Sequence, residues 1–338
     1  MTTPKTLVTA AVMAILTFGL GGVAAQQVGD DAALFIDAVA AAGDGDGAYT
    51  LGAVALEVQE VGGLLTGIAL EAPLDESGVA AAAGALAIAT GYGEGIRQPL
   101  VQFLTDQAPT LAGEGPVMLQ VEAFAMSVDV EAGDTPVARL GLERLAYPSD
   151  AFGAPAASIG PDDAAVAVRV FSDFECPFCR RYALEVQPMV EESVLAGADV
   201  RFEFHHLPLT SIHANAQPAA EAAQCVEQAA GVDAFWAFHD RLFETQDAWA
   251  GAADADAQFR RALAGVLEGQ PEAVQAAEAC IDDRATRDTV EASISRAREL
   301  SVSGTPTVFV GPYRMTNFGD AEAYLRLIRL TEAQAMQP

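Results

Sequence analysis

The sequence contains very little positive charge. Lysine and arginine together number 18 against 47 aspartates and glutamates, and the formal net charge is −29 over 338 residues. Proteins that bind nucleic acid need clustered basic side chains for the phosphate backbone, so we expect no nucleic-acid partner. The acidity is typical of a solvated surface, which favours solubility and identifies no partner by itself.

Histidine is also scarce, with four residues in the whole chain. His205 and His206 are neighbours on a predicted strand and should point to opposite faces of it, so they cannot easily bind one metal ion together. His213 and His239 are expected to pack in the core or lie at the surface. The sequence therefore predicts no metal site, and we expect no bound cofactor.

The first 25 residues differ in character from the rest of the chain. Lys5 precedes an apolar run over residues 7–20, and small residues follow at 23–25. This order is typical of a secretory signal peptide cleaved after Ala25, and an uncleaved N-terminal anchor is the alternative. Either interpretation predicts export to the periplasm or the extracellular side of the membrane, where cysteines can form disulfides.

The length of the chain is sufficient for two domains. Within residues 26–150, the patterns predict helices at 32–42, 78–89 and 96–107, and strands at 49–59, 64–70, 117–130 and 136–147, the last two joined by the turn EAGDT. We interpret this region as a small α+β domain of unknown function. The stretch 147–163 is rich in proline, glycine, serine and aspartate, which is typical of a linker.

Strands and helices alternate after the linker, in the region 151–338. The patterns predict strands at 165–171, 200–207, 305–311 and 313–318, a long helical region at about 214–299 and a closing amphipathic helix at 320–335. Such alternation predicts an α/β sheet domain that carries a helical insertion.

The segment FECPFCRR, residues 174–181, has two cysteines with two residues between them at the start of a predicted helix. Pro177 suits the first helical position, so unpaired helix N–H groups should face Cys176 and stabilise its thiolate. Cys179 lies one turn further on and should be more buried. We therefore predict a redox centre in which Cys176 attacks and Cys179 resolves. A structural disulfide or half of a zinc site is the alternative.

The predicted strand, CPFC, the helix with Pro188 inside it and the later VSGTPTVFVG together resemble the thioredoxin superfamily, specifically exported DsbA-like thiol–disulfide oxidoreductases. The resemblance covers residues 160–335, and FHHLPLTSIHANAQPAAEAAQC resembles the junction where such proteins insert a helical domain. It implies a thioredoxin-like fold in which Thr305 and Pro306 form a cis-proline loop that binds the substrate peptide. It also implies cysteine-containing protein substrates and a redox partner that regenerates the cysteine pair.

Two positions depart from the pattern of this family. Phe178 follows Pro177 where the best-known oxidases carry histidine, and a phenyl ring cannot stabilise a thiolate as histidine does. Thioredoxins place a buried carboxylate at the position of Val170, and Glu175 is the nearby candidate to substitute for it. We expect an oxidase that introduces disulfides into secreted proteins. A reductase or isomerase that uses the same centre, or an interaction protein with a redox-inert scaffold, is the alternative.

Cys225 and Cys280 both fall in the predicted helical insertion, 55 positions apart. We expect them to form a structural disulfide. Two buried free thiols, or a second redox pair that exchanges with the first, are the alternatives.

Residues 26–150 lie outside the resemblance and contain no chemical motif. By analogy with exported disulfide isomerases, we rank homodimerisation through this region slightly above binding of another partner.

Overall fold

The structure is a computed structural model that describes residues 27–40, 42–43, 48–192 and 199–337. The predicted signal peptide, residues 1–25, lies outside the described residues. The chain divides into two compact units, of which the first comprises Met1–Leu145 with Ala333–Pro338 and the second comprises Ala146–Glu332. The division between them falls slightly before the boundary expected at residue 150.

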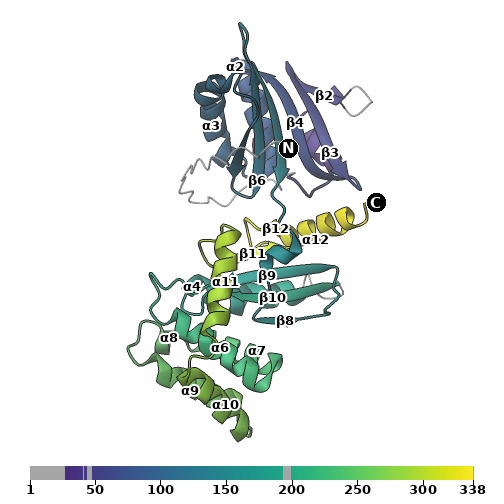
Figure 1. The fold of residues 1–338 in the computed structure, drawn as a ribbon. Helices are drawn as coiled ribbons and strands as arrows, with labels where there is room; N and C mark the ends of the chain where they lie inside the picture. The colour runs from purple at the N-terminus through teal and green to yellow at the C-terminus, as the bar shows by residue number, and fades with distance from the viewer. Residues whose placement is uncertain (1–26, 41, 44–47, 193–198, 338) are drawn as a thin grey trace, which may run out of the picture. The chain divides into compact units, whose positions relative to one another are not determined.

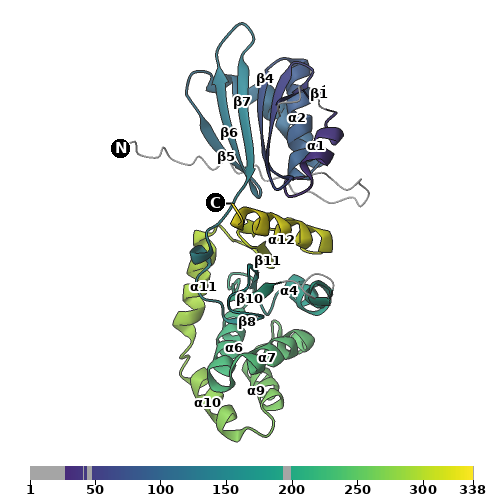
Figure 2. The same ribbon diagram turned by 90° about the vertical axis from the view of Figure 1, so that its right-hand side faces the viewer.

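The first unit is built on an antiparallel sheet with the strand order β1-β2-β3-β4-β7-β6-β5. Its strands are β1 (Ala42–Gly43), β2 (Ala48–Leu51), β3 (Val54–Val61), β4 (Leu64–Pro73), β5 (Val117–Val121), β6 (Phe124–Glu131) and β7 (Val137–Arg144). Its helical segments are α1 (Ala32–Ala38), α2 (Glu76–Thr90), α3 (Glu94–Gln102), the π-helical turn η1 (Phe103–Gln107) and the 3-10 helix η2 (Ala108–Leu111). Alternate residues of β6 and β7 are buried, as expected for a sheet covered on one face, and α2 packs on β3 and β4 (Figure 2).

Two of the predicted strands are each divided by a tight turn. The stretch 49–59 forms β2 and β3, with Gly52 in the left-handed region at φ 64°. The stretch 117–130 forms β5 and β6, with Glu122 at φ 53°. Val121 pairs directly with Phe124, so the chain reverses within two residues. The prediction of single strands was wrong because apolar residues flank such short turns and no long polar segment marks the reversal.

The second unit contains a mixed sheet with the strand order β12-β11-β9-β10-β8. The strands are β8 (Ala157–Ile159), β9 (Val166–Ser172), β10 (Val200–His206), β11 (Thr307–Val310) and β12 (Tyr313–Arg314). β9 and β10 pair in parallel, and the other neighbours are antiparallel. Both central strands are buried at almost every position, as expected when both faces of a sheet are covered.

Helices follow each of the central strands. After β9 the chain forms α4 (Pro177–Arg181), the π-helical turn η4 (Tyr182–Val186) and α5 (Gln187–Val190), so an irregularity occurs beside Pro188 as its chemistry requires. Between β10 and β11 lie α6 (Ala216–Ala230), α7 (Val232–Glu244), α8 (Gln246–Trp249), α9 (Ala255–Val266), α10 (Pro271–Asp282) and α11 (Arg287–Glu299) (Figures 1 and 2). The closing helix is α12 (Ala321–Ala335). Within the described ranges, no helix combines the length and hydrophobicity needed to cross a membrane.

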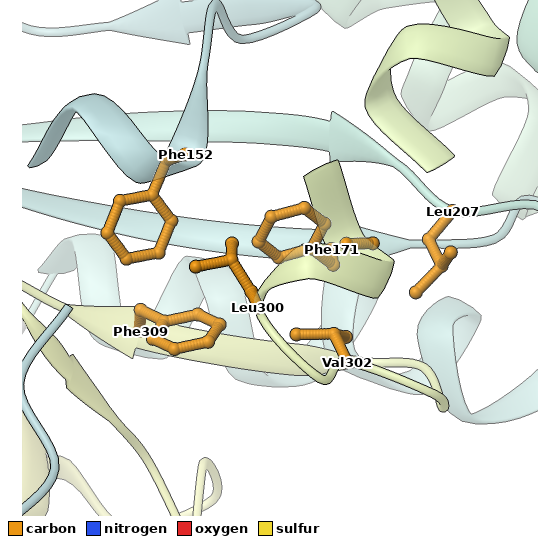
Figure 3. Close-up of a cluster of buried hydrophobic side chains, with 7 residues drawn as sticks. Phe152, Phe171, Leu207, Leu300, Val302 and Phe309 are labelled. Carbon is orange, nitrogen blue, oxygen red and sulfur yellow. The ribbon is translucent and has the colours of Figure 1, made fainter. Parts of the chain in front are cut away.

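Part of the predicted linker 147–163 belongs to the core of the second unit. It forms the 3-10 helix η3 (Ser149–Phe152) as well as β8. Phe152 is buried, its ring centroid lies 5.0 Å from that of Phe309, and the guanidinium of Arg169 lies 4.3 Å from its centre. Figure 3 shows this cluster, which consists of Phe152, Phe171, Leu207, Ala297, Leu300, Val302 and Phe309. The linker prediction was wrong for this stretch because composition does not reveal that Phe152 enters a core.

Candidate active site

Cys176 lies at the N-terminus of α4, just after the central strand β9. Its backbone is extended, with φ −73° and ψ 124°, and Pro177 takes the first helical position. The Arg180 N–H donates a hydrogen bond to the Cys176 carbonyl oxygen at 3.1 Å, which closes the first helical turn. The first N–H groups of a helix have no partner within it, so a sulfur at this position meets a favourable site for negative charge.

The two sulfurs of the pair have different surroundings. Cys176 is 4% exposed, whereas Cys179 is fully buried. The Cys179 side chain donates a hydrogen bond that, with the N–H groups of Cys179 and Phe178, lowers the pKa of Cys176 to about 6. Burial raises the pKa of Cys179 well above its ordinary value. At neutral pH the outer sulfur is therefore a thiolate and the inner sulfur is a thiol.

The loop before β11 lies against the cysteine pair. The peptide bond between Thr305 and Pro306 is cis, and the Thr305 carbonyl oxygen lies 3.7 Å from Sγ of Cys176. The loop reaches this place because β11 pairs directly with β9, with Thr307 opposite Phe171. The structure thus brings together the two cysteines and the Thr305-Pro306 loop, which are far apart in the sequence.

Phe178, between the two cysteines, is largely solvent-exposed. Its side chain is 66% exposed, and it contributes no charge to the site. Only its backbone N–H contributes to lowering the pKa of Cys176. At the position where the best-known oxidases carry histidine, this chain thus has an apolar side chain next to Cys176.

Glu175 does not substitute for the missing thioredoxin carboxylate. Its Oε1 accepts a hydrogen bond from the Gly251 N–H and its Oε2 accepts one from the Asn215 N–H, both at 2.6 Å. The carboxylate therefore joins the cysteine loop to the helical insertion and is occupied by backbone donors. At the position of that carboxylate, Val170 is buried in β9.

Sequence reasoning missed the polar residues that support the cysteine loop. Asp173 is buried, and its Oδ2 lies 2.7 Å from Nδ1 of His213 and accepts a hydrogen bond from the Leu209 N–H at 2.8 Å. The Asp173 N–H in turn donates to Sγ of Cys179 at 3.4 Å. Asp173 stands three positions before Cys176, and this proximity was the one available signal.

A further residue that the sequence did not indicate is Gln246, at the start of α8. Its Nε2 donates hydrogen bonds to the carbonyl oxygens of Phe174 at 2.8 Å and Cys176 at 3.1 Å. Gln246 lies 70 positions from Cys176, so no local pattern links the two residues.

The other predicted cysteine pair lies in the helical insertion. Cys225 of α6 and Cys280 of α10 form a disulfide, with 5.7 Å between their Cα atoms.

On β10, His205 stacks on Phe171, whereas His206 contacts the ring of Phe235. Burial lowers the pKa of His206 to about 3, so this imidazole is neutral.

A central parallel strand pair, a cysteine pair at a helix N-terminus and a cis-proline loop beside it define a thioredoxin-like domain. The family model described as "Thioredoxin" matches residues 154–329, more than half of the chain, and the chain belongs to this family. The predicted fold class is thereby confirmed: a thioredoxin-like α/β domain with a helical insertion, preceded by a separate small domain with a sheet.

Curated relatives each match about half of the chain. The Na(+)/H(+) antiporter NhaA 3 of Salinispora tropica is 36% identical over an alignment of 171 residues that covers 46% of this chain and 22% of that protein. Disulfide bond formation protein D of Bacillus subtilis is 26% identical over 165 residues, which are 48% of this chain and 70% of that protein. The chain therefore spans about a fifth of the antiporter's length and about two thirds of the Bacillus protein's length.

Solved structures of similar proteins also match slightly more than half of the chain. Oxidised BdbD from Bacillus subtilis has a TM-score of 0.48 and 23% identity, over 56% of this chain and 98% of that one. DsbA from Chlamydia trachomatis has a TM-score of 0.44 and 20% identity, over 56% of this chain and 98% of that one.

Proposed function

We propose that this chain is an exported protein thiol–disulfide oxidoreductase that introduces disulfides into secreted proteins. The observation that carries the proposal is the difference between the two sulfurs. Cys176 lies at a helix N-terminus with its pKa lowered to about 6, and Cys179 is buried behind it with a raised pKa. The likeness to disulfide bond formation protein D supports the same activity.

The reaction begins from the oxidised pair, in which Cys176 and Cys179 are joined by a disulfide. A substrate thiolate attacks Sγ of Cys176, the bond between the two enzyme sulfurs breaks, and Cys179 leaves as a thiolate and takes up a proton. A second substrate thiolate then attacks the substrate sulfur of the mixed disulfide, and Cys176 leaves as a thiolate. The low pKa of Cys176 makes it a good leaving group in this step.

The balance of electrons requires a partner. The substrate loses two electrons as its disulfide forms, and the enzyme is left as a dithiol that a redox partner must oxidise again. The Thr305-Pro306 loop supplies the backbone beside Cys176 on which an extended, cysteine-containing substrate segment is placed. The distance of 3.7 Å between the Thr305 carbonyl oxygen and Sγ of Cys176 supports this role.

Export is part of the same proposal. Its support is the signal-like pattern of residues 1–25, with cleavage after Ala25, and the disulfide between Cys225 and Cys280, which is typical of oxidising compartments. The destination is the periplasm or the extracellular side of the membrane. Residues 26–150 are proposed to mediate homodimerisation.

The test is the equilibrium reduction potential of the Cys176–Cys179 pair in glutathione buffers, with the two pairs distinguished by mass spectrometry. We expect a potential near the ~−120 mV of DsbA, because a stabilised Cys176 thiolate favours the reduced form. A potential near the ~−270 mV of thioredoxin would instead assign the same atoms to a reductase or isomerase. A pair that does not exchange with glutathione at all would contradict any redox function.

A further inference from the structure

Gln246 connects the helical insertion to the backbone of the attacking cysteine. It is the first residue of α8 and is 4% exposed. Its Nε2 donates to the carbonyl oxygens of Phe174 at 2.8 Å and Cys176 at 3.1 Å. We infer that Gln246 is a positioning residue, through which the insertion keeps Cys176 in the backbone conformation that directs its sulfur at the N-terminus of α4.

One amide group constrains the cysteine loop at two carbonyl groups. The two carbonyl groups that it contacts lie on either side of the peptide unit between Glu175 and Cys176. Fixing both of them restrains the ψ angle of Cys176, which is 124°, although this residue lies outside the regular helix. With ψ in this range, Sγ of Cys176 faces the backbone N–H groups of Phe178 and Cys179. Both groups contribute to lowering the pKa of Cys176.

The Cys176 carbonyl oxygen does not need Gln246 merely to avoid an unpaired buried acceptor. It already accepts a hydrogen bond from the Arg180 N–H at 3.1 Å. The second donor comes from a different element and approaches from outside α4. The Gln246 amide therefore fixes the direction of the Cys176 carbonyl group. The helical hydrogen bond alone would restrict this direction less, because the residue lies at a helix end.

Two neighbouring contacts also join the helical insertion to the cysteine segment, but neither involves the backbone of Cys176. Asp247 forms an ion pair with Arg180 at 2.9 Å, and the Gly251 N–H donates to Glu175. Both end on side chains, and the Asp247 side chain is 84% exposed. Among these contacts, that of Gln246 is the one made with the backbone of Cys176 itself.

The test compares Gln246→Leu with the parent protein in the full mature chain. Leucine has a similar volume and no N–H donor, so the loop loses both hydrogen bonds. The measurement is the rate at which iodoacetamide alkylates reduced Cys176 as a function of pH, with the modified residue identified by mass spectrometry. We expect the midpoint to rise from about 6 to about 7, so the rate at pH 5 falls about tenfold.

The matched control is Gln224→Leu. Gln224 is also a buried glutamine of the insertion, and its Nε2 donates to Glu227 at 3.1 Å, away from the cysteine loop. Its substitution should leave the midpoint of Cys176 unchanged, whatever it does to the melting temperature. A parental pH profile in Gln246→Leu, accompanied by a lowered melting temperature, would reduce Gln246 to a packing residue and overturn the inference.

Gln246→Asn guards against failure of the leucine variant to fold. Its amide is one methylene shorter and cannot span both carbonyl oxygens, so we expect a smaller rise of the midpoint, in the same direction. An unchanged midpoint in a folded Gln246→Asn protein counts against the inference. The inference rests on the proposed function in naming Cys176 the attacking thiol. Alkylation needs no protein substrate, so failure of the redox proposal shows separately in the reduction potential.

Discussion

At the scale of single residues, the lowered pKa of Cys176 depends chiefly on Cys179. The Cys179 side chain makes the largest contribution to lowering the pKa of Cys176 to about 6. Cys179→Ala removes this hydrogen-bond donor, whereas Cys179→Ser keeps a hydroxyl donor in the same place. We therefore expect the pKa of Cys176 to rise towards the ordinary value of 9.0 in the alanine variant and to rise less in the serine variant.

The pH dependence of thiolate absorbance in the ultraviolet measures this difference. A depressed pKa keeps Cys176 charged at neutral pH, so raising it removes thiolate below pH 9 and slows alkylation there. Cys176→Ser serves as the blank that lacks the titrating sulfur. Identical titration curves for the alanine and serine variants would show that hydrogen bonding by residue 179 is unimportant.

The residues around the Cys176 sulfur were predictable, whereas those that support the loop were not. Cys176, Cys179 and Pro177 form one local pattern, and the Thr305-Pro306 loop was implied by the resemblance. His213 and Gln246 lie 40 and 70 positions from the residues that they contact. Such contacts depend on how the insertion returns to the sheet, and no local spacing contains that information.

At the scale of elements, the disulfide between Cys225 and Cys280 joins α6 to α10 and should act as a staple of the insertion. Replacing both cysteines with alanine frees a loop of 55 positions in the unfolded chain. We expect the free energy of unfolding to fall by about 2 to 4 kcal/mol, measured by urea denaturation of the oxidised protein. The alkylation profile of Cys176 should stay that of the parent, because Cys225 and Cys280 lie in the insertion beside Thr286 and Gln228.

Redox titration of the parent protein, together with turnover of the double alanine variant, separates a structural disulfide from a second redox pair. A structural disulfide should remain intact in glutathione buffers that reduce Cys176–Cys179, because structural bonds resist that pool. If Cys225–Cys280 were reduced alongside the active-site pair, or if its removal slowed turnover without affecting stability, the structural assignment would be wrong.

At this scale, the sequence did not predict where some of the strands and the linker begin and end. Strand alternation continues across tight turns such as that at Gly52, so β2 and β3 were interpreted as one strand. The region 147–163 was interpreted from its proline and glycine content, although Phe152 packs into the core. The type and order of the long elements were predictable, since strong apolar periodicity survives in each of them.

At the scale of the whole molecule, every group that we assign to the active site belongs to the second unit. The cysteine pair, the Thr305-Pro306 loop and Gln246 all lie between residues 146 and 332. The family match covers residues 154–329, which lie within the second unit. The chemistry of the cysteine pair and the role of the first unit can therefore be tested separately, by comparing a chain that contains both units with a chain that contains the second unit alone.

A chain of residues 26–338 and a shortened chain of residues 146–338 form this comparison. We expect the same reduction potential for Cys176–Cys179 in both, because the groups that set the pKa of Cys176 are Cys179, Phe178 and Thr305. We expect light scattering to give a dimer for the longer chain and a monomer for the shorter. A monomer in both cases would favour partner binding over homodimerisation for the first unit. A changed potential in a folded short chain would mean that the first unit acts on the redox centre itself.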